Sequence, residues 1–165
     1  MTYEKILAAL DRSSHSDLVF EQALNLAQKE GAKLMLFHGI PLDQHQGLFL
    51  HEFELTTEPL ARYASALQTE LERQQTEIQQ WLSDYCQNAK KLGITVESKV
   101  GFGEPGKVIC DLARRWDADL IVLGRRGLTG MMEMLMGSVS SYVVHRAPCT
   151  VSIVQSKLNP ASQDG

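Results

Sequence analysis

Five short apolar runs alternate with stretches of helical periodicity, and this alternation constrains the fold of the 165-residue chain. The runs at 5–10, 33–38 and 119–124 are continuously apolar, as strands covered on both faces of a sheet are. The run at 95–100 alternates apolar and polar residues, which predicts an edge or half-exposed strand. The fifth run spans 148–154.

Helical segments lie between these runs. Residues 14–29 and 105–116 carry apolar residues at helical spacing. Gly31 provides a stop for the first of these helices. Pro105 suits the first position of the second. Residues 138–146 predict a short final helix.

The connection between the second and third runs is longer than a crossover requires. We expect an irregular loop over residues 41–57, followed by one long helix or two abutting helices over 59–92. The glutamate- and glutamine-rich outer face of this segment predicts a solvated surface, with a partner-binding helix as the alternative. The length suits a single α/β domain over 1–155, with a disordered tail over 156–165.

The order βαβαβαβαβ predicts a doubly wound, five-stranded parallel sheet with strand order 3-2-1-4-5 and helices on both faces. In such sheets, ligands bind at the carboxyl ends of the strands where the strand order reverses. The reversal lies between the first and fourth strands. The ends of these strands, at Asp11 and Gly124, are therefore the expected location of a site.

Composition argues against several classes of function. The net charge is only −4, which does not favour nucleic acid as the main partner. No apolar run is long enough to span a membrane, and the N-terminal MTYEKIL lacks the pattern of a secretory signal. Cys86, Cys110 and Cys149 are too widely spaced for a zinc or disulfide framework. We expect a cytoplasmic protein with reduced thiols.

The glycine-rich segment after the fourth strand carries the strongest chemical signal. Glycines let backbone N–H groups approach a phosphate, and a helix N-terminus adds free N–H groups and positive dipole. Arginines and serine hydroxyls supplement these donors. The alternative is a glycine-rich turn with a glycine–serine cap and no ligand. The groups concerned are Gly124, Arg125, Arg126, Gly127, Gly137, Ser138 and Ser140.

Two further patterns have structural interpretations. A literal GxGxxG over 101–106 follows a strand and opens a helix, as a dinucleotide fingerprint does. It follows the third strand at the sheet edge, however, so we interpret it as a tight turn. Asp11, together with Ser13, Ser14 and Ser16, could alternatively form no more than the N-cap region of a helix.

The pattern G-x2-G-x9-G-[S/T], formed by Gly124, Gly127, Gly137 and Ser138, resembles the ATP-binding branch of the universal stress protein family. The similarity extends to KILAALDRSSHS and GSVSSYVVHRAPCTVSIV and covers nearly the whole chain. It implies ATP, or a product such as ADP or AMP, as ligand. Mg²⁺ would be carried by the phosphates, with no metal ligand from protein side chains.

The resemblance also implies roles for single positions. Arg125 departs from the family pattern, which often has serine there. Ala9 and Gly39 stand where larger residues often line the base. Base and ribose would lie against Ala9, Leu10, Asp11, Gly39 (after the second strand), Leu123 and Gly124, and the phosphates against Gly127, Gly137, Ser138, Val139 and Ser140.

The last strand also suggests an assembly. Residues 147–156 carry no charge, and the predicted order places the strand 148–154 at an edge of the sheet. Bare apolar edges are usually paired or covered. We therefore expect a homodimer in which this strand pairs antiparallel across a two-fold axis, in agreement with the dimer that the resemblance implies.

The function expected from these features is that of a nucleotide-binding regulatory or stress-response protein. A slow ATPase is one alternative, although the sequence offers no obvious base to activate water. A protein-interaction module that works without ligand, through the helix at 59–92, is another.

Overall fold

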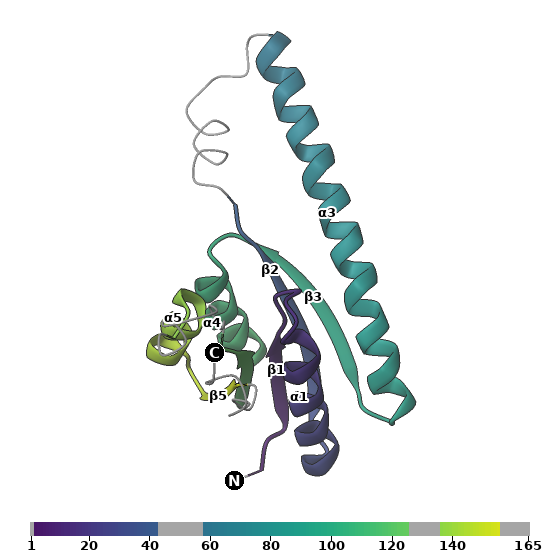
Figure 1. Ribbon diagram of the computed structural model, residues 1–165, viewed down its shortest axis with the longest axis vertical. Coiled ribbons are helices and arrows are strands. Elements are labelled where there is room, and N and C mark those ends of the chain that lie inside the picture. Colours follow the sequence, from purple (N-terminus) through teal and green to yellow (C-terminus); the bar gives the residue numbers. More distant parts are fainter. Residues whose placement is uncertain (1, 43–57, 126–135, 156–165) are drawn as a thin grey trace, which may run out of the picture.

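A computed structural model describes residues 2–42, 58–125 and 136–155 of the chain (Figure 1). Five strands form one parallel sheet in the predicted order β3-β2-β1-β4-β5. The strands are β1 (Lys5–Ala9), β2 (Lys33–Ile40), β3 (Val96–Phe102), β4 (Leu120–Gly124) and β5 (Thr150–Val154). The helices in the described ranges are α1 (Ser16–Glu30), α3 (Glu58–Lys91), α4 (Pro105–Trp116) and α5 (Ser138–Arg146).

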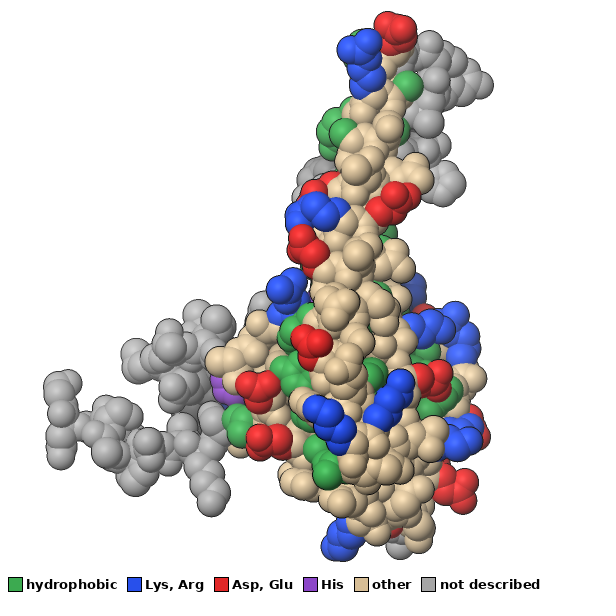
Figure 2. Space-filling view, turned by 90° about the vertical axis from the view of Figure 1, so that its right-hand side faces the viewer, with side chains coloured by type: hydrophobic (Ala, Val, Ile, Leu, Met, Phe, Trp, Pro, Cys, Tyr) green, Lys and Arg blue, Asp and Glu red, His purple; other side chains and the backbone are tan. Residues whose placement is uncertain are grey.

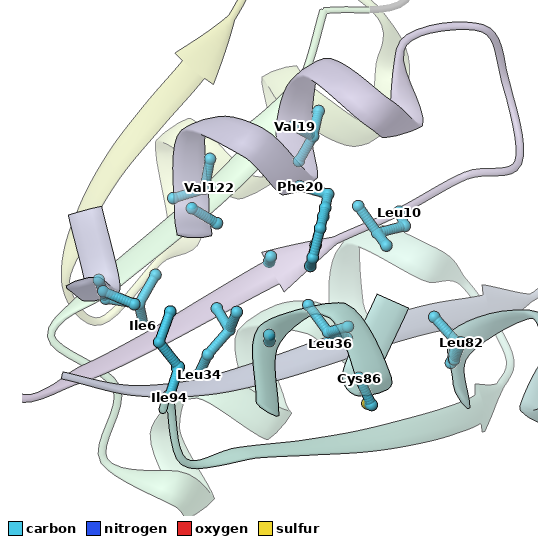
Figure 3. Packing of buried hydrophobic residues seen from close by; sticks show 14 of the residues in the cluster. Ile6, Leu10, Val19, Phe20, Leu34, Leu36, Leu82, Cys86, Ile94 and Val122 are labelled. Atoms are coloured by element: carbon cyan, nitrogen blue, oxygen red, sulfur yellow. The ribbon is translucent and has the colours of Figure 1, made fainter. Parts of the chain in front are cut away.

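Helices cover both faces of the sheet, as predicted (Figure 1). On one face, α1 and α3 pack against β1 and β2 around a core that includes Phe20, Leu36 and Leu82 (Figure 3). On the other face, α4 and α5 enclose a second core that includes Phe37 and Ile109. Because both faces are buried, the central strands are continuously apolar.

The predicted helix boundaries are explained by the backbone preferences of glycine and proline. Gly31 adopts a left-handed φ of 71° and its N–H donates to Ala27, which ends α1. Pro105 opens α4 at its first turn.

The second and third strands both run further than predicted, to Ile40 and Phe102, and this changes the position of Gly39. We expected Gly39 to follow the second strand, but it lies within β2. The extension of β3 explains the difference, since Gly39 pairs with Gly101 and Ile40 with Phe102.

The glycines of the 101–106 motif each have a packing or turn role. A Cβ on Gly101 would lie 2.9 Å from atoms of both Phe37 and Val108. Gly103 has a φ of 123°, and a Cβ on Gly106 would lie 3.0 Å from Tyr142. The motif is therefore accounted for by close helix–sheet and helix–helix packing around a turn.

In the described part of the chain after β2, the predicted helical segment forms one continuous helix, α3, of 34 residues. Among its described side chains, the buried ones lie in the C-terminal half, from Ile78 to Ala89. Figure 1 shows that the N-terminal half extends past the carboxyl ends of the strands, and Figure 2 shows acidic and basic side chains along it. No helix of the described ranges is long and apolar enough to cross a bilayer. Residues 43–57 and the expected tail at 156–165 lie outside the described residues.

Candidate functional site

A cavity of about 510 Å³ opens at the carboxyl ends of the strands. Its walls come from the ends of β1, β2 and β4, from the first turns of α4 and α5, and from the middle of α3. The cavity thus occupies the predicted reversal of strand order between β1 and β4.

Most of the residues expected at the site line this cavity. They come from three strands and one helix that are distant in sequence, and the sheet order brings them together. The expected residues found in the lining are Ala9, Leu10, Asp11, Gly39, Leu123, Gly124, Gly137, Ser138, Val139 and Ser140.

The other three expected residues have different outcomes. Arg126 and Gly127 lie outside the described residues. Arg125 is described but is not part of the lining. Its backbone N–H donates to the Val154 carbonyl at 2.9 Å, and its Nη1 donates to Gln155 Oε1 at 3.2 Å. Pairing with β5 therefore directs Arg125 toward the sheet edge.

Asp11 organises the loop between β1 and α1. Its Oδ1 accepts the Ser13 N–H at 3.0 Å and the hydroxyl of buried Ser16 at 3.3 Å. The N-cap position of α1 is His15, whose side chain makes no capping hydrogen bond. Asp11 therefore supports the turn before the helix, as the alternative interpretation anticipated, while also lining the cavity.

The N-terminus of α5 supplies the backbone donors of the site. Gly137 is the N-cap in an extended conformation, and its carbonyl accepts the Ser141 N–H at 2.9 Å. The N–H groups of the first turn have no partner within the helix by its geometry, so they suit an anion. Ser140 is buried and its hydroxyl donates to the Gly137 carbonyl at 3.0 Å, which leaves its lone pairs for accepting.

Several lining residues were not predicted from the sequence. Pro105 and Ile109 of α4 reach the cavity although β3, which precedes them, is an edge strand. The lining residues from α3 could not be predicted, because no local sequence pattern indicates how this helix packs over the sheet. The additional lining residues are Arg12, Phe37, His38, Ile40, Pro41, Gln74, Glu77, Ile78, Pro105 and Ile109.

His38 is a neutral hydrogen-bonding group in the cavity wall. Its Nδ1 lies 2.7 Å from the Leu10 carbonyl, which can only accept, so Nδ1 carries the proton and Nε2 is an acceptor. Burial lowers the pKa of His38 below its ordinary value. The Trp81 ring packs edge-on against the imidazole at 5.7 Å between centroids.

Few charged side chains occur among the described residues that line the cavity. Asp11 and Glu77 provide carboxylates, and Arg12 provides a guanidinium. No cluster of three or more His, Cys, Asp or Glu suited to a metal occurs among the described residues. The arrangement fits a ligand that brings its own anionic groups to the α5 N-terminus.

The profile of the universal stress protein family matches residues 2–155. The chain belongs to this family. A universal stress protein of Synechocystis is 46% identical over 155 residues, covering 94% of this chain and 99% of that protein. The family explains why the resemblance extended over nearly the whole sequence.

Solved structures share the fold at lower identity. The hypothetical protein MJ0577 superposes with a TM-score of 0.73 at 21% identity, covering 96% of this chain and all of that chain (100%). A universal stress protein described in complex with cAMP has a TM-score of 0.61 at 22% identity, covering 94% and 98%. One from Archaeoglobus fulgidus, described in complex with dAMP, has a TM-score of 0.59 at 22% identity, covering 94% and 100%.

Proposed function

We propose that the chain binds an adenine nucleotide, ATP or a product such as ADP or AMP, and acts as a nucleotide-dependent regulatory protein of the cytoplasmic stress response. The observation that carries the proposal is that one cavity joins Asp11, which follows β1, to the N-terminus of α5. These two features supply the base and phosphate ends of one ligand.

The cavity chemistry supports a nucleotide. Leu10, Phe37 and Ile109 give apolar surface suited to a planar base. The carboxylate of Asp11 can accept hydrogen bonds from ribose hydroxyls. The first turn of α5 offers N–H donors and positive dipole to phosphates.

Mg²⁺ fits this site as a companion of the phosphates. It prefers oxygen ligands and keeps several waters, with one or two carboxylates at most from the protein. Asp11 and Glu77 are the carboxylates of the described lining. They would help to hold the ion, which would neutralise part of the charge of the phosphates.

Proteins of the same fold support adenine as the base. Two of them are described in complex with cAMP and with dAMP, both of which are adenine mononucleotides. The common element is an adenine ring with at least one phosphate, which is the smallest ligand that would use both ends of the cavity.

Isothermal titration with ATP and Mg²⁺ tests the proposal. We expect saturable heat and a thermal shift with wild type, and loss of both in Gly137→Val, because the added side chain would cover the α5 N-terminus. The φ of Gly137 is −60°, so the backbone tolerates valine. Ser141→Val adds the same side chain to α5 outside the cavity lining and should retain binding. No heat with wild type at millimolar ATP, ADP and AMP would overturn the proposal.

A further inference from the structure

Arg12 occupies an unusual place in the cavity wall. It follows Asp11 in the loop after β1 and adopts a left-handed φ of 61°, which a non-glycine residue rarely does. The Asp11 carboxylate fixes this turn by accepting the Ser13 N–H. The strained backbone therefore sets the direction in which the Arg12 side chain leaves the loop.

Arg12 is the only Arg or Lys among the described residues that line the cavity. His38 is kept neutral by burial, which lowers its pKa, and Arg125 is directed toward Gln155. Asp11 and Glu77 contribute negative charge. Within the described lining, an anionic ligand thus meets one positively charged side chain.

The guanidinium of Arg12 contacts a side chain of helix α3. Its central carbon lies 5.8 Å from the centroid of the Trp81 ring. Trp81 in turn contacts His38 and packs edge-on against Tyr85 at 5.3 Å. Arg12 is thus joined to α3 by a cation–π contact. Within the described part of the chain, no hydrogen bond or ion pair competes for its donors.

We propose that Arg12 binds a phosphate of the ligand. When a ligand occupies the cavity, the Arg12 guanidinium leaves the Trp81 ring for the phosphate, and this changes the surroundings of α3. The assignment rests on the proposed nucleotide site. An exposed cation–π contact is weaker than a charge-assisted, bidentate guanidinium–phosphate interaction, so a phosphate in reach draws the guanidinium off the ring. Arg12 and the N-terminus of α5 both line the cavity, so one ligand can meet both.

The tryptophan content of the chain makes this measurable. The chain has two tryptophans. Trp116 lies at the end of α4, where its carbonyl accepts Lys5 Nζ at the start of β1, away from the cavity. In the full-length Trp116→Phe variant, Trp81 is the single tryptophan. We expect its emission to change on AMP addition along the same saturation curve as the heat of binding.

Three comparisons separate the roles. Arg12→Gln should weaken AMP binding about tenfold, as loss of a charged hydrogen bond does, and abolish the emission change at saturation. Its affinity for adenosine, which lacks phosphate, should stay unchanged. Arg146→Gln removes an exposed arginine that lies at a similar distance, 5.9 Å, over Tyr142 outside the lining, and should alter neither readout.

The possible outcomes distinguish the role of Arg12 from the nucleotide site itself. Heat on AMP addition with constant Trp81 emission, or an unchanged affinity of Arg12→Gln for AMP, overturns the role of Arg12 and leaves the nucleotide site standing. An equal loss for adenosine and AMP overturns the phosphate assignment. Absence of heat with every nucleotide removes the site and the sensor together. If Trp116→Phe lowers folding by circular dichroism, Trp81→Phe in the wild-type background serves instead and should lose the emission change.

Discussion

Burial of His38 favours its uncharged form and makes the stability of the folded protein depend on pH. The imidazole is half-buried between the Leu10 carbonyl and Trp81. Burial lowers its pKa, and nearby Arg12 acts in the same direction, while the Leu10 carbonyl and Asp11 oppose the shift. The folded protein therefore binds this proton less tightly than the unfolded chain does.

This difference predicts how stability depends on pH. Because the folded pKa is depressed, the stabilisation is present above the ordinary value of 6.5 and is lost as the pH falls through the folded pKa. His38→Asn keeps a donor for Leu10 but cannot titrate. Urea unfolding at about pH 7 and about pH 5 should show a smaller loss of unfolding free energy for the variant. An unchanged loss in His38→Asn would contradict the prediction.

At the scale of elements, an aromatic contact fastens α3 to α1. Tyr85 of α3 packs on Phe20 of α1 at 4.7 Å between ring centroids, and its hydroxyl donates to Asp17 Oδ1 at 2.6 Å. Burial, followed by this hydrogen bond, raises the pKa of Tyr85 to about 12. The hydroxyl is therefore a neutral donor at physiological pH.

Removing that donor should loosen the contact between the two helices. We expect Tyr85→Phe to cost about 1 kcal/mol of unfolding free energy, the usual net value of one hydrogen bond. In a chain of this size the thermal midpoint would fall by about 3 °C. Tyr63→Phe deletes the same hydroxyl in the exposed part of α3 and should leave the midpoint unchanged. Equal midpoints for the two variants would show that the Asp17 bond adds nothing.

The elements also show where sequence patterns stop being informative. Strand order and helix placement follow from apolar periodicity and from glycines such as Gly31, because these signals are local. Asp11 could be located because topology fixes where strands end, and Gly137 because the glycine–serine pair marks the start of the last helix. Gln74 and Glu77 could not, because a helix's position over a sheet depends on packing distant residues together. The direction of Arg125 depends on pairing with β5, which the glycine pattern does not encode.

At the scale of the whole molecule, the two sheet edges differ in charge. At one edge, β3 carries exposed Glu97 and Lys99, a common protection against pairing. At the other, β5 is uncharged. Hydrogen bonds of Thr150 and Val154 face β4, so by alternation the N–H groups of Val151 and Ile153 face the open edge. We propose that two copies pair through β5.

A charge placed on this edge tests the pairing. Ser152 lies at the centre of β5, where a two-fold axis would bring two copies of the residue together. We expect wild type to have the mass of a dimer by light scattering at micromolar concentration. Ser152→Lys should give a monomer, because like charges would face each other. Lys99→Ser on β3 should leave the mass unchanged. A monomeric wild type would refute the proposal.

The extension of α3 beyond the strands has a consequence for how the molecule responds to salt. Its C-terminal half is fixed by buried side chains such as Leu82. Its N-terminal half is supported by exposed charge pairs, with Arg73 bridging Glu70 and Glu77. Such pairs weaken as ionic strength rises, whereas buried apolar contacts do not. One helix thus combines a C-terminal half held by buried apolar contacts with an N-terminal half supported by charge pairs that reach the cavity lining at Glu77. A rise in ionic strength weakens the second set of contacts and not the first.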